Sequence, residues 1–216
     1  MPIDVFSNGD LVFDVGANIG NKAAQFLARG ARVVCFEPQP ACVERLRVRF
    51  GGDPRVTIVP KGLADQAGRL TLSICDVDTL STFSEQWKRG RHASNRWSDS
   101  AQVDVITLDS AIADYGRPRY CKIDVEGFEM NVLRGLTQSV DVLSFEFTKE
   151  FIENAAAAVS YLNGIGMNEF TVALGENDFF SVDGWVDGHL LVDAIGRHEH
   201  RLLWGDLYAR SPVRVS

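Results

Sequence analysis

The sequence predicts an α/β protein with a seven-stranded, doubly wound sheet whose last strand is antiparallel. Two observations support this fold class. Short apolar runs alternate along the chain with helical segments, and glycines end most of the predicted helices. No repeat, low-complexity tract or linker interrupts the pattern. With 216 residues the chain is long enough for one sizeable core, so we expect a single domain over 1–216.

The N-terminal part predicts three strands connected by two helices. Gly30 ends the first helix, whereas Pro38 and Pro40 stop the second strand and start the second helix. The predicted strands are 11–15, 32–36 and 56–60, and the predicted helices are 21–29 and 41–50.

The middle of the chain has a different pattern. Residues 69–75 and 102–108 alternate apolar and polar side chains, which is typical of strands with one wet face. We expect an inserted antiparallel β-hairpin between strands three and four of the main sheet. Residues 76–101 are rich in serine, arginine and tryptophan, and we expect a long mobile loop there.

The C-terminal half returns to alternating strands and helices. The predicted strands are 120–125, 142–147, 169–174 and 203–208. Helices are expected at 129–134 and 150–163, with a weaker helical stretch after Gly188. Seven strands with interleaved helices complete the predicted doubly wound sheet.

Composition limits the classes of function. The formal net charge of -7 argues against general binding to nucleic acid or to an anionic membrane. No apolar run approaches the roughly 20 residues that span a bilayer, and residues 1–10 show no secretory signal. Four cysteines without a C-x-x-C pair predict buried, reduced thiols. We therefore expect a cytoplasmic protein.

The most informative stretch is a glycine-containing turn after the first strand. Gly16 and Gly20 frame the turn, Asp14 precedes it, and Glu37 ends the next strand. Gly16 removes a Cβ that would collide with a ligand, and Gly20 lets the next helix start close to the strand. Asn18 stands where a dinucleotide motif has its central glycine.

These residues favour a sulfonium nucleoside over a dinucleotide. A pyrophosphate needs close backbone approach at position 18, and the charge of Asp14 would repel it. The carboxylate of Glu37 can accept hydrogen bonds from both ribose hydroxyls. The pattern therefore predicts S-adenosylmethionine as the cofactor. The alternative for Glu37 is an exposed acid in a β-turn at the end of a strand, without a role in binding.

Five segments also carry a family resemblance. Residues 14–20, 36–38, 62–65, 81–83 and 122–127 occur in this order, and together they resemble the FkbM family of class I S-adenosylmethionine-dependent methyltransferases. The resemblance runs from about residue 11 to residue 147. It implies a Rossmann-like class I methyltransferase fold and O-methylation of a natural product or sugar.

Carried over by position, the resemblance implies the cofactor site. The turn around the methionine part would comprise Asp14, Gly16, Ala17, Asn18 and Gly20, and Glu37 would hold the ribose. Gly62, Leu63 and Asp65 would border the adenine. Asp65 has an alternative explanation as a turn residue near Gly68.

The fourth strand of the main sheet supplies the candidate chemistry. Lys122, Asp124 and Glu126 share one face if the strand runs straight, and Lys122 can pair with Asp124. Ligands in such sheets lie at the carboxyl ends of the strands, so Asp124 is expected to face the reacting methyl group. Asp124 is the first candidate for the base or orienting residue, followed by Glu126 and Glu146. The alternative is a structural ion pair.

Asp124, Glu126 and Glu146 could also hold a divalent metal ion that acidifies the acceptor hydroxyl. Nothing in the sequence fixes their geometry, and we predict no metal.

The long loop supplies the candidate acceptor contacts. Its cations and aromatic side chains suit a carbohydrate or an anionic acceptor, with tryptophan stacking on a sugar face. The predicted contacts are Ser81, Thr82, Phe83, Trp87, Arg91 and Trp97. We expect the loop to act as a lid over the cofactor or acceptor. The same side chains would suit RNA, which the net charge disfavours, or they could belong to a solvated loop with anchoring tryptophans.

The sequence thus predicts an O-methyltransferase for a small hydroxylated metabolite, natural product or sugar, with neither nucleic acid nor a membrane as partner. A homodimer is expected because little chain precedes the first strand. Two alternatives stay open. One is a nicotinamide-dependent oxidoreductase, which Asp14 and Asn18 disfavour. The other is a module that binds S-adenosylmethionine without turnover.

Overall fold

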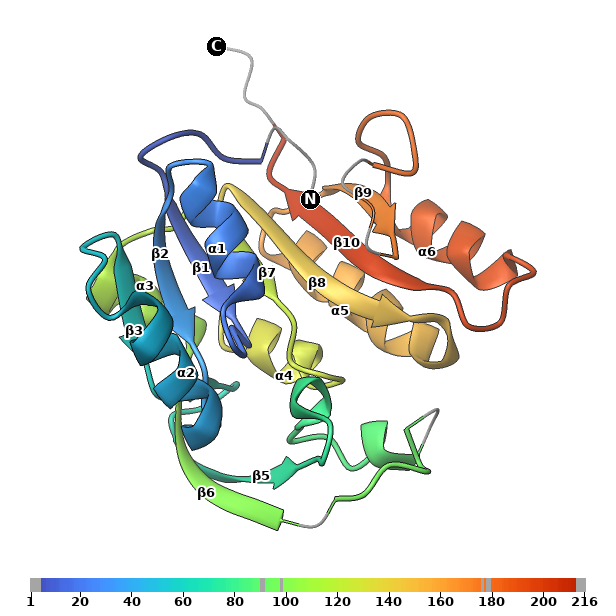
Figure 1. The fold of residues 1–216 in the computed structure, drawn as a ribbon. Coiled ribbons are helices and arrows are strands. Elements are labelled where there is room, and N and C mark those ends of the chain that lie inside the picture. Colours follow the sequence, from blue (N-terminus) through green and yellow to red (C-terminus); the bar gives the residue numbers. More distant parts are fainter. Residues whose placement is uncertain (1–4, 90–91, 98, 176, 178–179, 213–216) are drawn as a thin grey trace.

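Seven strands form one twisted sheet in the computed structural model, which describes residues 5–89, 92–97, 99–175, 177 and 180–212 (Figure 1). In chain order they are β1 (Leu11–Val15), β2 (Arg32–Phe36), β3 (Val56–Val59), β7 (Tyr120–Ile123), β8 (Val142–Thr148), β9 (Glu169–Leu174) and β10 (Trp204–Arg210). The ends of these strands differ from the predicted ends by no more than two residues.

The order of the strands creates a switch point beside β1. Across the sheet the order is β3-β2-β1-β7-β8-β10-β9. The chain moves from β1 outward to β3 on one side and then continues with β7 on the other side of β1. β10 is antiparallel to both β8 and β9, which confirms the predicted antiparallel last strand. Ligands of open α/β sheets bind where the strand order reverses, at the carboxyl ends of the strands.

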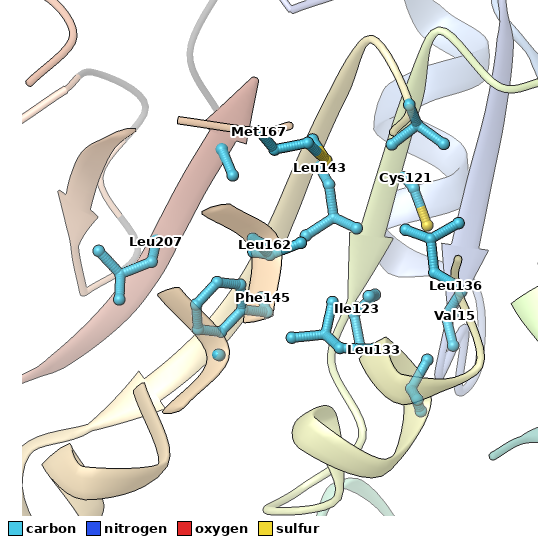
Figure 2. Packing of buried hydrophobic residues seen from close by; sticks show 14 of the residues in the cluster. Val15, Cys121, Ile123, Leu133, Leu136, Leu143, Phe145, Leu162, Met167 and Leu207 are labelled. Atoms are coloured by element: carbon cyan, nitrogen blue, oxygen red, sulfur yellow. The ribbon is translucent and has the colours of Figure 1, made fainter. Parts of the chain in front are cut away.

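Helices cover both faces of the sheet (Figure 1). One face carries α1 (Asn21–Ala28) and α2 (Pro40–Phe50), and the other carries α3 (Leu108–Tyr115), α4 (Glu129–Arg134), α5 (Ile152–Gly164) and α6 (Gly188–Arg197). Side chains of β7 alternate between the two layers, with Tyr120 packed near α1 and Cys121 in the opposite core. Leu133, Phe145 and Leu162 belong to that opposite core (Figure 2).

The inserted segment folds into a small second sheet. It contains β4 (Gly62–Leu63), β5 (Gly68–Ile74) and β6 (Asp99–Ile106) in the order β4-β6-β5. The antiparallel pairing of β5 with β6 confirms the predicted hairpin. β4 has only two residues, which is too short for any sequence pattern. In Figure 1 this small sheet lies beyond the carboxyl ends of β1 and β2.

Two local expectations need correction. The predicted strand 102–108 ends at Ile106, where Thr107 caps α3 by accepting a hydrogen bond from the backbone N–H of Ser110 at 3.1 Å. The predicted strand 120–125 ends at Ile123, so Asp124 and Glu126 lie in the turn before α4 rather than on a straight strand face.

The four cysteines are buried and free, as predicted, with Cys35 in β2 and Cys121 in β7. Among the helices of the described residues, none combines the length and apolarity that crossing a membrane requires.

Truncation of the core behind the switch point should destabilise the fold. Leu133 of α4 is 0% exposed, so Leu133→Ala should lower the free energy of unfolding by about 2–5 kcal/mol through lost burial and a cavity. Leu190 of α6 is 67% exposed, and Leu190→Ala should change it by less than about 0.5 kcal/mol. Urea denaturation of both variants measures the difference, and equal effects would contradict the described packing.

Candidate active site

The turn after β1 touches the turn after β7. Gly16 has φ of +81°, and a Cβ on it would lie 1.8 Å from the backbone oxygen of Asp124. The backbone N–H of Asp124 donates to Val15 O at 3.0 Å, and that of Gly16 donates to Phe36 O at 2.9 Å. The sequence suggested that Gly16 makes room for a ligand. The structure shows that the neighbouring backbone already needs this space.

Asn18 joins the turn to the end of β2. Its φ is +49°, a left-handed conformation that asparagine tolerates better than most residues. Its backbone N–H donates to Glu37 Oε2 at 2.7 Å. Gly20 has φ of +82° and lets the start of α1 pack closely against Phe50 of α2, because a Cβ on Gly20 would lie 2.3 Å from the Phe50 ring.

Glu37 is a buried acid held by backbone donors. Besides Asn18, the backbone N–H of Gln39 donates to its Oε1 at 2.8 Å. Burial raises the pKa of Glu37 to about 7, although the two N–H donors act in the opposite direction. Glu37 is 5% exposed and lines a pocket, so it presents a carboxylate that is fixed before any ligand arrives.

Asp14 is more deeply buried, at 1% exposed. Its Oδ2 finds no hydrogen-bond partner among the described residues. Burial raises the pKa of Asp14 to about 6, and the charge of Lys122 counteracts part of this rise. Asp14, Lys122 and Asp124 line one groove, which continues along the α1 side of the turn.

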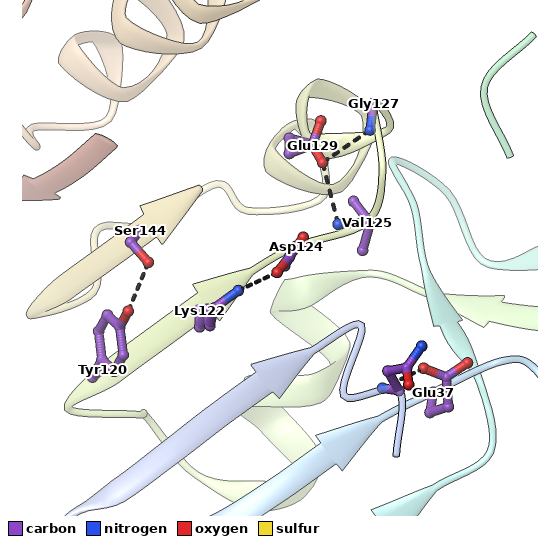
Figure 3. A network of polar contacts seen from close by, with 9 residues as sticks. Glu37, Tyr120, Lys122, Asp124, Val125, Gly127, Glu129 and Ser144 are labelled. Carbon is purple, nitrogen blue, oxygen red and sulfur yellow. Dashed lines mark hydrogen bonds and ion pairs between the residues drawn. The ribbon is translucent and has the colours of Figure 1, made fainter. Parts of the chain in front are cut away.

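Lys122 is the buried cation of the site. Its Nζ donates to Asp124 Oδ2 at 2.5 Å, and its side chain is 4% exposed (Figure 3). Burial works against its charge. The carboxylates of Asp124, Asp206 and Asp14 outweigh burial and raise the pKa of Lys122. The ion pair predicted between Lys122 and Asp124 is therefore present, and it has further acidic neighbours.

Three carboxylates meet beside this pair. Asp124, Glu126 and Glu146 each place one oxygen within 4.8 Å of the others, although they come from a turn and from β8. Burial raises the pKa of Glu126 and of Glu146 well above the usual value, and Asp124 raises both further. Such a group can hold a proton or a cation, because its charges repel one another when all are ionised.

Glu129 supports this turn from the first turn of α4. Its Oε1 accepts hydrogen bonds from the backbone N–H groups of Val125 at 3.2 Å and Gly127 at 3.1 Å (Figure 3). Burial raises the pKa of Glu129 to about 7. Glu129 was not predicted from the sequence, although it is an acid at the start of a predicted helix. Asp206, which pairs in register with Glu146 across β10 and β8, was not predicted either.

A pocket of about 120 Å³, partly open to solvent, lies over the switch point. Its walls are formed by Gly16, Asn18, Glu37, Pro38, Gln39, Leu72, Thr79, Ser81, Phe83, Asp124, Val125 and Glu126. The predicted adenine neighbours are absent from these described walls. Gly62 and Leu63 are buried in β4, and Asp65 is exposed. Leu72 of β5 and Gln39, which no motif marked, line the pocket instead.

The predicted acceptor residues of the insert have different environments. Ser81 and Phe83 line the pocket, but Thr82 is 1% exposed and donates to the backbone oxygen of Glu126 at 2.6 Å. Trp87 is 4% exposed; its ring packs against Gly127 and lies 6.1 Å from the ring of Phe151.

The indole nitrogen of Trp97 is also buried, and Arg91 lies outside the described residues. The expected mobile loop is therefore anchored at Thr82 and Trp87.

Comparison with known proteins adds a family. The model of the methyltransferase FkbM domain matches residues 14–160. The chain belongs to the FkbM methyltransferase family. The match includes the turn after β1, Glu37, the insert and the carboxylate group, so the resemblance noted from five short segments is confirmed.

Two curated proteins are similar to this FkbM domain. The hexuronic acid methyltransferase AglP of Haloferax volcanii is 28% identical over 140 residues, which cover 63% of this chain and 54% of AglP. The 2-O-methyltransferase NoeI of Sinorhizobium fredii is 27% identical over 153 residues, which cover 64% of this chain and 62% of NoeI. The FkbM domain thus spans little more than half the length of these relatives.

Solved structures confirm the fold. The methyltransferase FkbM from Methylobacillus flagellatus has a TM-score of 0.54 at 17% identity, covering 94% of this chain and 44% of its own. The precorrin-6y C5,15-methyltransferase from Geobacter metallireducens has a TM-score of 0.51 at 12% identity, covering 96% and 82%. Both likenesses support the predicted Rossmann-like class I architecture of the FkbM domain.

The buried acids should make stability decrease as pH rises. The folded pKa values of Glu37, about 7, and Asp14, about 6, exceed the usual values of 4.5 and 3.8. The folded state therefore holds more protons between these limits, and its stability is lost as pH rises through the folded pKa. Ionisation of Glu37 alone should lower the free energy of unfolding by roughly 2 kcal/mol between about pH 5 and about pH 8.

Urea denaturation across this pH range measures the slope, and Glu37→Gln should flatten it. If Glu37→Gln keeps the full pH dependence of the free energy of unfolding, Glu37 does not bind the extra proton.

Proposed function

We propose that this FkbM domain transfers a methyl group from S-adenosylmethionine to a hydroxyl of a small molecule, with sugars as the favoured acceptor class. The observation that carries the proposal is the shared pocket of Glu37 and Asp124. These residues lie on the two sides of Gly16 at the switch point, one at the end of β2 and one after β7. A nucleoside held by Glu37 would extend toward the carboxylates after β7.

The residues present fit S-adenosylmethionine. Glu37 has fixed oxygens with lone pairs left for ribose hydroxyls. Asp14 offers an oxygen without a partner among the described residues, which suits the ammonium of the methionine part. The bound cofactor would supply an electrophilic methyl group on a positive sulfonium. Asp124 and its acidic neighbours make a favourable setting for that charge.

The carboxylates divide into two roles. Asp124 is tied to Lys122 at 2.5 Å, so we assign it the orientation of the reacting groups rather than proton removal. Burial raises the pKa of Glu126 and of Glu146 well above the usual value, so each carboxylate, once ionised, accepts a proton more readily than an ordinary glutamate. The base assigned first to Asp124 therefore moves to Glu126 or Glu146. Removal of the hydroxyl proton would leave an oxygen aligned for in-line displacement.

A second, narrow cavity of about 30 Å³ adjoins the carboxylates. It is lined by Trp87, Gly127, Glu129, Met130, Phe145, Glu146, Phe147, Thr148, Phe151, Asn154, Ala155 and Ala158. A cavity of this size suits a small substituent of the acceptor rather than a whole ring. The names of the two curated relatives, a hexuronic acid methyltransferase and a 2-O-methyltransferase, support a sugar hydroxyl. The acidic surroundings disfavour nucleic acid, and a homodimer stays a prediction.

The donor half of the proposal can be tested without an acceptor. Isothermal titration calorimetry should show binding of S-adenosylhomocysteine and no comparable binding of NAD. Glu37→Gln should weaken binding of S-adenosylhomocysteine about tenfold or more. The NH2 of the new amide would face a backbone N–H group, and the ligand would lose a charged acceptor. Wild-type affinity should increase from about pH 6 to about pH 8 as Glu37 ionises. Tight NAD binding without binding of S-adenosylhomocysteine would overturn the proposal.

The acceptor half needs a transfer assay with labelled donor and a panel of sugars. Glu146→Gln should lower kcat about 100-fold with little change in donor affinity, because it removes a proton acceptor. Glu153→Gln, an exposed position on α5, is the matched control and should retain the wild-type rate. EDTA should leave the wild-type rate unchanged. Loss with EDTA and recovery with Mg²⁺ would instead place a cation among Asp124, Glu126 and Glu146.

A further inference from the structure

Glu126 has a backbone conformation that needs external support. Its φ is +55°, and among the described residues Asn18 is the other non-glycine residue with positive φ. Unlike asparagine, glutamate gains little local compensation in this region, and such conformations cost of order 1–3 kcal/mol. The surrounding structure must hold the turn for the Glu126 carboxylate to stay beside Asp124 and Glu146.

Support comes from two directions. From α4, Glu129 accepts the backbone N–H groups on either side of Glu126, those of Val125 and Gly127. From the insert, the Thr82 hydroxyl donates to the backbone oxygen of Glu126 itself at 2.6 Å. The bond to Thr82 joins parts of the chain that are 44 residues apart.

Thr82 is well placed to hold this turn because it is itself fixed. It forms two backbone hydrogen bonds with Ser73, at 2.9 and 3.0 Å, that extend the edge of β5. Its hydroxyl also accepts the backbone N–H of Ser84 at 2.8 Å.

Neighbouring residues of the insert pack on the same turn. The rings of Phe83 and Phe128 lie 5.2 Å apart. A Cβ on Gly127 would lie 2.8 Å from the ring of Trp87.

We propose that Thr82 is a positioning residue that couples the insert to the carboxylate of Glu126. This role replaces the acceptor contact expected from the sequence, since the side chain is buried and already engaged. The insert then does more than cover the site. When its Ser81–Thr82–Phe83 segment is seated, the turn after β7 is held in the geometry that brings three carboxylates together. The catalytic part of this inference rests on the proposed function.

The test compares two substitutions at one position. Thr82→Val keeps the shape and removes the hydroxyl, whereas Thr82→Ser keeps the hydroxyl. In the transfer assay, Thr82→Val should lower kcat at least about tenfold, with the dissociation constant of S-adenosylhomocysteine within about threefold of wild type. Thr82→Ser should recover most of the rate. Thr57→Val on the exposed edge of β3 is the matched control and should behave as wild type.

Hydrogen exchange supplies a readout that does not require activity. The amides of Val125 and Gly127 should exchange at least about tenfold faster in Thr82→Val than in wild type or Thr57→Val, because the turn loses one of its supports. Unchanged exchange would overturn the coupling. Faster exchange with an unchanged kcat would overturn the positioning role.

A wild-type protein that binds S-adenosylhomocysteine but methylates no hydroxylated acceptor would instead count against the proposed function. In that case the exchange measurement still decides whether Thr82 holds the turn.

Discussion

The site depends on one buried ammonium group. Lys122 lies in the middle of the sheet with a side chain that is 4% exposed, and acids approach it from β1, from the turn after β7 and from β10. A buried charge without partners would cost several kcal/mol, and so would these carboxylates without a cation. Lys122 and its acids therefore require one another. For Glu126 and Glu146, burial and the neighbouring carboxylates outweigh the charge of Lys122 and raise the pKa of both.

Glu37 shows how the pocket over the switch point is ordered before a ligand binds. Its two oxygens accept the backbone N–H groups of Asn18 and Gln39, so the acid also stabilises the two turns that border the pocket. A ligand that binds there does not have to order the carboxylate first, and less of its binding energy is lost to conformational entropy. The same hydrogen bonds keep a buried acid tolerable in the absence of a ligand.

Most of the main sheet could be predicted from the sequence because its strands are short apolar runs bounded by glycine, proline or charged residues. The turn after β1 and the pairing of Lys122 with Asp124 were predicted for the same local reasons. The rest depends on contacts between distant segments. No local pattern shows that Thr82 reaches Glu126, that Trp87 packs on Gly127, or that β4 joins the small sheet. The end of β7 was predicted two residues too late, because the left-handed backbone at Glu126 follows from tertiary support.

The contact between Gly16 and the backbone of Asp124 has a mechanical consequence. At this point the two central turns have no space between them, so neither can shift toward the other without a collision. The spacing between Glu37 at the end of β2 and the turn after β7 is therefore fixed when the sheet forms. A rearrangement of the insert would instead act on the orientation of the Glu126 carboxylate, through the hydrogen bond from Thr82.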